Sequence, residues 1–133
     1  MNIVIDTNVV ISGTFFGGFP RKVLEAVVDK TLPAYATAEI ADEYTEIVRE
    51  MIDRKQGHLS KSVLTPFIHS LHLVEAKTTV EVSRDPDDDK FIVCAIDSKS
   101  YYIVSGDKDL LVLEKYEDIN IITAAEFCRR FLP

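Results

Sequence analysis

The chain has 133 residues, of which 47% are hydrophobic, and a formal net charge of −7 from 22 acidic and 15 basic side chains. This length and balance exclude a disordered or low-complexity chain and are sufficient for one folded core, so we expect residues 1–133 to form one domain. The acidic balance argues against a protein that holds nucleic acid by bulk positive charge. That objection weakens if the acids gather in one place and bind cations, because the cations reverse the local sign.

The N-terminal segment predicts a cytoplasmic protein. Met1 to Ile5 is a short apolar run that stops at Asp6, without the basic region or cleavage site of a secretion signal. Apolar runs elsewhere fall far short of the roughly 20 residues that cross a bilayer. Cys94 and Cys128 have no CxxC spacing and lie in apolar helical patterns, so we expect reduced core cysteines and no membrane partner.

Hydrophobic periodicity and capping residues predict alternating strands and helices. The expected strands are 2–5, 33–36, 101–104 and 119–122, with a short extended piece at 73–75. The expected helices are 9–14, 21–30, 37–55, 60–71, 87–98 and 109–113, with a last one after 123. Residues 15–20 are expected to form a flexible aromatic loop that ends at Pro20, a residue suited to opening the next helix. This alternation predicts a mostly parallel sheet covered on both faces, with any ligand beyond the carboxyl ends of the strands, where the strand order reverses.

Two isolated acids lie at positions of interest. Asp6 directly follows the first strand, although taken alone it could serve only as a helix cap. Glu43 lies within the long helix and borders its apolar stripe of Ile40, Tyr44 and Ile47. A solvated surface glutamate is the ordinary interpretation of that position.

Two acidic segments are denser. Asp85-Pro86-Asp87-Asp88-Asp89 exceeds what helix capping requires, because like charges repel and a bound cation would relieve the repulsion. Ser105-Gly106-Asp107-Lys108-Asp109 follows a buried strand, where a polar turn is the alternative interpretation. Oxygen ligands without histidine or cysteine favour Mg²⁺ or Mn²⁺ over zinc. The three histidines offer no competing centre, and the sequence contains no phosphate-binding glycine motif or nucleophile elbow.

Four segments resemble PIN domains in order and spacing, and most of all the PIN-family toxins of toxin–antitoxin systems. They cover the chain from its first strand to the last acidic turn: Ile3–Val10, Thr37–Tyr44, Arg84–Phe91 and Val104–Leu111. The terminal Ile122–Phe127 also fits. The resemblance implies an α/β fold, a three-layer α/β/α sandwich around a mostly parallel sheet of four to five strands.

The resemblance also assigns roles by position. Asp6, Glu43, Asp88 and Asp107 would be the catalytic carboxylates, with Asp89 as the close alternative to Asp88. Asp88 is preferred because Ala95, seven residues on, matches the small helix residue of the family. The expected metal ligands are Asp6, Asp88, Asp107, Asp89 and Asp109, and the expected supporting residues are Thr7, Asn8 and Ser105.

The activity that the resemblance implies is Mg²⁺- or Mn²⁺-dependent endonucleolytic cleavage of RNA. A small antitoxin protein and a homodimer are the implied partners. Two rival interpretations remain. A haloacid dehalogenase-like phosphatase would need an acid where Asn8 stands, and a PIN-like module could bind RNA or a partner without cutting.

Overall fold

The computed structural model describes residues 1–54 and 63–133. Its elements, in chain order, are β1 (Ile3–Ile5), α1 (Thr7–Phe15), α2 (Gly18–Val28), β2 (Ala34–Ala36), α3 (Ala38–Arg54), α4 (Leu64–Ser70), β3 (His72–Leu73), the 3₁₀ helix η1 (Pro86–Asp88), α5 (Asp89–Asp97), β4 (Tyr102–Val104), α6 (Lys108–Leu111), β5 (Lys115–Tyr116), β6 (Ile119–Ile122) and α7 (Ala124–Phe131).

The strands form one sheet in the order β3-β2-β1-β4-β6-β5. All neighbouring pairs are parallel except β5 with β6, which form an antiparallel hairpin. β1 lies at the centre, with Ile3 opposite Ala34 on one side and opposite Tyr102 on the other. Its residues are at most 1% exposed because the sheet is covered on both faces, which explains why this strand is uniformly apolar.

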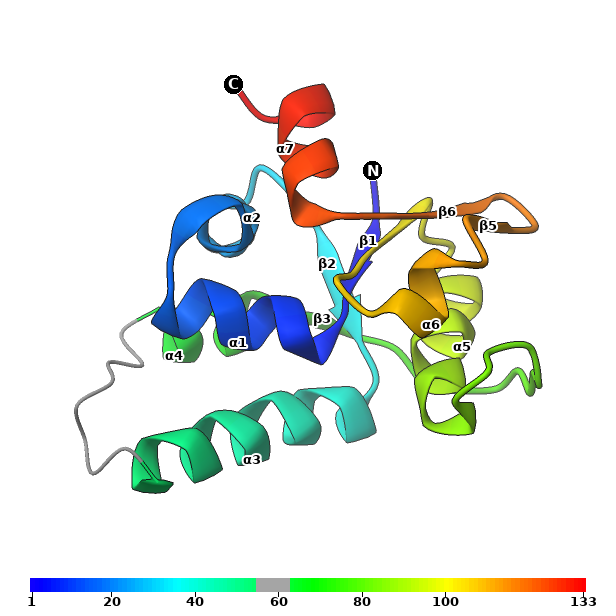
Figure 1. Ribbon diagram of the computed structural model, residues 1–133, viewed down its shortest axis with the longest axis horizontal. Helices are drawn as coiled ribbons and strands as arrows, with labels where there is room; N and C mark the ends of the chain where they lie inside the picture. Colours follow the sequence, from blue (N-terminus) through cyan, green and yellow to red (C-terminus); the bar gives the residue numbers. More distant parts are fainter. Residues whose placement is uncertain (55–62) are drawn as a thin grey trace.

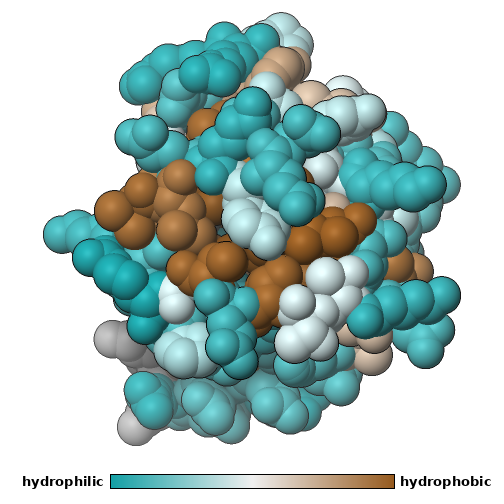
Figure 2. All heavy atoms as spheres, turned by 90° about the vertical axis from the view of Figure 1, so that its right-hand side faces the viewer, coloured by the Kyte–Doolittle hydropathy of each residue, from teal (hydrophilic) through white to brown (hydrophobic). Residues whose placement is uncertain are grey.

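Helices cover both faces of the sheet (Figure 1). α5 packs against β1, β2 and β4 on one face, while α1, α2, α3 and α4 pack on one another on the opposite side, where α7 contacts α2. The face that carries α5 and α6 shows hydrophobic side chains in its middle, surrounded by hydrophilic ones (Figure 2). None of the helices within the described ranges combines the length and the apolar character of a membrane span.

The mixed α/β architecture and the mostly parallel sheet confirm the predicted fold class, but the described residues contain six strands rather than four to five. The difference comes from β3 and β5, which have two residues each. The expectation of a flexible loop at 15–20 was wrong in extent. α1 runs to Phe15 and α2 starts at Gly18, so Pro20 lies inside the first turn of α2. The start of the helix expected at 60–71 lies outside the described residues.

The strand order reverses beside β1. The chain passes from β1 to β2 and β3 on one side, then returns across the sheet to β4 on the other side of β1. The carboxyl ends of β1 and β4 therefore flank the point at which open parallel sheets bind ligands. Asp6 and Ser105 are the first residues after these two strands.

Candidate active site: a carboxylate cluster at the strand ends

Asp6 is a buried carboxylate fixed by the neighbouring strand. Its backbone N–H donates to the carbonyl oxygen of Val104 at 2.9 Å, which continues the pairing of β1 with β4. The hydroxyl of Ser105 donates to Asp6 Oδ2 at 2.8 Å. Burial raises the pKa of Asp6, the Ser105 hydrogen bond opposes this, and the negative charge of Asp107 raises it further. The side chain is only 3% exposed, so its orientation is set by the fold.

The turn after β4 holds Asp107 beside Asp6. The backbone N–H of Asp107 donates to Ser105 Oγ at 2.9 Å, so one hydroxyl orients both the buried carboxylate and the turn. Asp107 Oδ1 accepts the N–H of Asp109 at 2.8 Å and thereby caps α6. The predicted polar turn and the predicted acidic site are thus the same structure.

Asp88 points into this group from η1. It is 7% exposed, and its Oδ2 has no hydrogen-bond partner among the described residues. Burial raises the pKa of Asp88 to about 7, with further contributions from Asp107, Asp6 and Asp85. A buried carboxylate oxygen without a donor is costly to maintain. A cation is the simplest group that would satisfy it.

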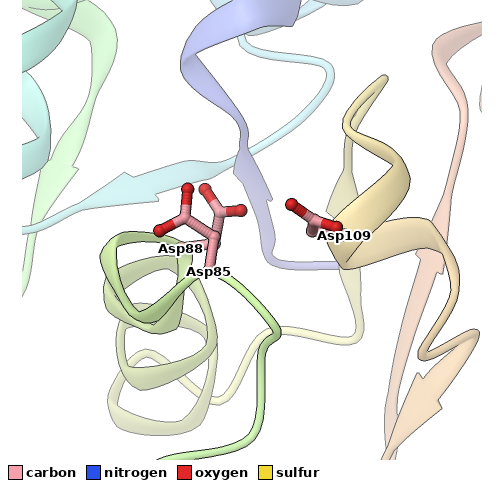
Figure 3. Close-up of side chains that lie close together, drawn as sticks. All are labelled: Asp85, Asp88 and Asp109. Carbon is pink, nitrogen blue, oxygen red and sulfur yellow. The ribbon is translucent and has the colours of Figure 1, made fainter.

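Asp88 also belongs to a second group of acids. One carboxylate oxygen each of Asp85, Asp88 and Asp109 lies within 4.8 Å of the other two. Figure 3 shows Asp85 and Asp88 side by side at the start of the helix, with Asp109 facing them from α6. Asp109 Oδ1 is paired with the exposed Arg84 at 2.9 Å. These three carboxylates could hold a metal ion.

Glu43 reaches the site from α3, but both of its oxygens are already engaged. Thr7 Oγ1 donates to Oε2, and Lys90 Nζ donates to Oε1. Lys90 Nζ also contacts Asp87 Oδ2 at 3.1 Å. Partial burial lowers the pKa of Lys90, but its hydrogen bonds to Glu43 and Asp87 outweigh this and raise it. A charged lysine therefore lies against Glu43.

Asp89, the alternative to Asp88, binds backbone N–H groups instead of facing the other acids. Its Oδ1 accepts the backbone N–H groups of Ser83 at 2.8 Å and of Val82 at 3.3 Å. The side chain is buried and ties the segment before η1 to the first turn of α5. This geometry favours Asp88 over Asp89 as the carboxylate that faces Asp6 and Asp107.

Asn8 supports the site through its backbone. The N–H groups of Asn8 and Thr7 lower the pKa of Asp6 by hydrogen bonding, although burial dominates and raises it. The Asn8 side chain is exposed and lines a groove beside the cluster.

Two residues of the site were not assigned individual roles from the sequence. Asp85 was considered only as one acid of the segment 85–89, and it accepts the N–H of Asp87 at 3.1 Å while also joining the acid cluster. Lys90 was not named among the candidate site residues. Its position one turn from Asp87 gave a signal for that ion pair, but nothing in the sequence indicated that it would meet Glu43.

The donor set fits a hard divalent cation. All candidate ligands are carboxylates, the buried Asp88 has an unsatisfied oxygen, and burial, with added repulsion from neighbouring acids, raises the pKa values of Asp6 and Asp88. Oxygen ligands of this kind suit Mg²⁺ or Mn²⁺. Asp6, Asp88 and Asp107, bordered by Asp85 and Asp109, are the residues that would hold it.

Comparison with known proteins agrees with this geometry. The family model described as PIN domain matches residues 2–109, which include every carboxylate named above. The chain is 33% identical to an uncharacterized protein of Methanocaldococcus jannaschii, over an alignment that covers 98% of this chain and 92% of that protein. The search of solved structures found no significant match. The chain therefore belongs to the PIN domain family, a family of nucleases that typically use divalent metal ions.

Proposed function

We propose that this protein is a metal-dependent endoribonuclease that cleaves RNA phosphodiester bonds with Mg²⁺ or Mn²⁺. The observation that carries the proposal is Asp88, a buried carboxylate with an unsatisfied oxygen, held against Asp107 and Asp6 at the switch point of the sheet. Burial of an unpaired carboxylate oxygen costs free energy when no metal ion is bound. A bound cation would offset that cost.

Each carboxylate has a defined part in the proposed reaction. Asp6, Asp88 and Asp107 would hold the ion, and Ser105 keeps Asp6 and the Asp107 turn in place through its hydroxyl. A bound ion would supply polarisation of the phosphate and a water of lowered pKa. Asp85 and Asp109 lie next to Asp88 and would add negative charge to the site. Glu43, oriented by Thr7 and Lys90, would position the attacking water.

The biological role that we propose is that of the toxin of a toxin–antitoxin pair, acting in the cytoplasm as a homodimer and neutralised by a small antitoxin protein. The support for this finer statement is the resemblance of the four segments to PIN-family toxins. A short reading frame directly upstream of the gene would favour it. Co-purification of that product with this chain, and loss of nuclease activity in the complex, would test it.

The decisive experiment is cleavage of a labelled single-stranded RNA in Mn²⁺ or Mg²⁺. We expect Asp6→Asn, Asp88→Asn and Asp107→Asn each to lower the rate by at least about 100-fold while the fold is retained, because each removes a charge that holds the ion. Asp42→Asn is the matched control, since Asp42 is an exposed acid next to Glu43 in the chain. It should cleave like the wild type, and a chelator should abolish all activity.

Four results would contradict the proposal. Cleavage that survives Asp88→Asn would show that the cluster is not the active site. Faster cleavage of DNA than of RNA would contradict the substrate. Turnover of para-nitrophenyl phosphate without nuclease activity would favour a phosphatase, and RNA binding without any cleavage would favour a non-catalytic module.

A further inference from the structure

A groove opens directly beside the carboxylate cluster. It has a volume of about 360 Å³ and runs between the starts of α1, α2 and α7 and the turn after β4. Asn8, Ser105 and Gly106 line the end next to Asp6, and Phe19, Pro20 and Ala124 line the other end. Its size falls in the range of roughly 300–1,000 Å³ typical of small-molecule sites. A ligand bound there would lie against residues that orient the catalytic acids.

The lack of charged side chains distinguishes this groove from its surroundings. None of the described residues that line it carries a charge, although the chain as a whole has a net charge of −7. A larger cavity of about 610 Å³ on the other side of the site is lined by Glu39, Glu75 and Lys90, and Lys90 is already paired with Glu43. A phosphodiester chain would be repelled by the two glutamates and not by the uncharged groove.

The far end of the groove presents an aromatic ring with a cation. Phe19 is 38% exposed, and the Arg129 guanidinium lies 5.5 Å from the centre of its ring. The carbonyl oxygen of Phe19 accepts a hydrogen bond from Cys128 Sγ at 3.5 Å, which fixes this residue against α7. Burial raises the pKa of the Cys128 thiol, so it keeps the proton that it donates. An aromatic face beside an arginine is a common surface for stacking an unpaired base.

Glycine at position 106 keeps the groove open. A Cβ added there would meet no other atom within 4 Å, and the backbone is not in the left-handed region. Neither packing nor conformation therefore requires glycine at this position. Glycine here leaves this part of the groove wall, next to Asp107 in the chain, without a side chain.

We propose that this groove binds the nucleotide next to the scissile phosphate of single-stranded RNA. The base stacks on Phe19, and the Arg129 guanidinium beside that ring receives the adjoining phosphate. This inference rests on the proposed ribonuclease function. It specifies in addition that the RNA strand leaves the active site through this groove.

The test measures binding of a fluorescent eight-nucleotide single-stranded RNA by anisotropy in Ca²⁺, separately from cleavage. Phe19→Ala should weaken binding by about 5- to 100-fold, the range expected for one stacked base, and Phe19→Trp should restore it. Phe16→Ala is the matched control because Phe16 is 73% exposed and does not line the groove. Arg129→Ala should weaken binding, whereas Arg130→Ala should not, since Arg130 is paired with Glu126.

An abasic scan locates the base. Each nucleotide of the RNA is replaced in turn by an abasic one. At one position this replacement should weaken binding to the wild type. The same replacement should not weaken binding to Phe19→Ala any further, because that variant has already lost the stacking contact. The groove assignment is overturned if Phe19→Ala binds within twofold of the wild type, or if Phe16→Ala is equally impaired. In that case a loss of cleavage in Asp88→Asn would still support the nuclease. If the wild type neither binds nor cleaves RNA, both proposals fail.

Discussion

Asp88 is a carboxyl group in a place that disfavours its charge. Burial is the main cause, and Asp107, Asp6 and Asp85 add repulsion. Its pKa is about 7 in the folded protein, against 3.8 for a free aspartate. The metal-free protein therefore takes up a proton at this position near neutral pH, and a metal ion must displace that proton to bind.

This raised pKa predicts how stability depends on pH. Between about pH 4 and pH 7 the folded chain binds more protons than the unfolded chain, so the free energy of unfolding must fall as the pH rises through that window. In a chelator, the wild type should melt at a lower temperature at about pH 8 than at about pH 5.5. Asp88→Asn should remove most of this slope and stabilise the protein at the higher pH by about 1–3 kcal/mol.

Scanning calorimetry of the two proteins at both pH values measures the effect. Asp42→Asn should keep the wild-type slope. The pKa of Asp97 is lowered, so the stability that Asp97 contributes is lost only on acidification below about pH 4. Its contribution is therefore the same at both pH values of this experiment. A wild type that is more stable at the higher pH, or an unchanged slope in Asp88→Asn, would show that Asp88 ionises normally.

Lys90 places a positive charge at one side of the carboxylate cluster. Its side chain is 15% exposed and that of its partner Glu43 is 24% exposed, so the pair is shielded from water more than a surface ion pair. We expect Lys90→Met to lower the free energy of unfolding by about 1–3 kcal/mol, because it leaves Glu43 beside other acids without a counter-charge. Lys108→Met, at an exposed lysine, should have little effect.

A double-mutant cycle in urea separates the pair from its surroundings. Adding Glu43→Gln to Lys90→Met should recover part of the lost stability, because the unpaired charge is then gone. Additive losses in the double variant would mean that the two side chains contribute independently and that the ion pair does not orient Glu43.

At the scale of elements, the long periodic helices and the apolar strands were predictable, since their patterns depend only on which face is buried. Thr37 caps α3 as expected, with its Oγ1 accepting the N–H of Ile40 at 3.2 Å. Thr123 caps α7 in the same way through Glu126 N–H at 3.2 Å, but the Glu126 side chain pairs with Arg130 instead of returning to Thr123. β5 was missed, and β3 was expected only as a short extended piece at 73–75, because two residues carry no alternation and these strands are defined by their pairing with β6 and β2.

The segment between β3 and η1 shows what local patterns omit. It has little regular structure, and two aspartates of α5 hold it. Asp97 accepts the N–H groups of Lys77 and Thr78 at 2.6 and 3.0 Å, and Asp89 accepts those of Val82 and Ser83. Hydrogen bonds between residues 6 to 20 positions apart leave no periodic signature in the sequence. The segment therefore depends on α5 for its path.

This dependence gives a prediction for the two aspartates. Asp97→Ala should lower the free energy of unfolding by about 1–2 kcal/mol and speed amide exchange at Lys77 and Thr78, because charge-assisted hydrogen bonds are lost. Nuclease activity should be retained.

Asp89→Asn should instead weaken Mn²⁺ binding, since Ser83 lies just before Asp85 and the segment positions that carboxylate. Hydrogen exchange with mass spectrometry and calorimetric Mn²⁺ titration distinguish the two, and equal effects on metal binding would refute this division of roles.

At the scale of the whole molecule, the distribution of charge matters more than its sum. The acids that make the chain negative include a cluster at the strand ends, and an uncharged groove lies beside it. The positions of Asp6 and of the Asp107 turn could be predicted, because both directly follow strands whose carboxyl ends share one edge of the sheet. The preference for Asp88 over Asp89 came only from the family resemblance, and the pairing of Lys90 with Glu43 could not be predicted, because it depends on side-chain directions at the start of a helix.

The central place of β1 also has a consequence for synthesis on the ribosome. β1 is made first, yet its neighbour β4 and the Asp107 turn are made about a hundred residues later. A nascent or truncated chain that ends within α5 carries Asp6, Glu43 and Asp88 but has no strand to complete the middle of the sheet and no Ser105 to orient Asp6. Folding and the assembly of the carboxylate cluster are thus coupled to the same late step of translation, and prematurely terminated products of this gene would be inert.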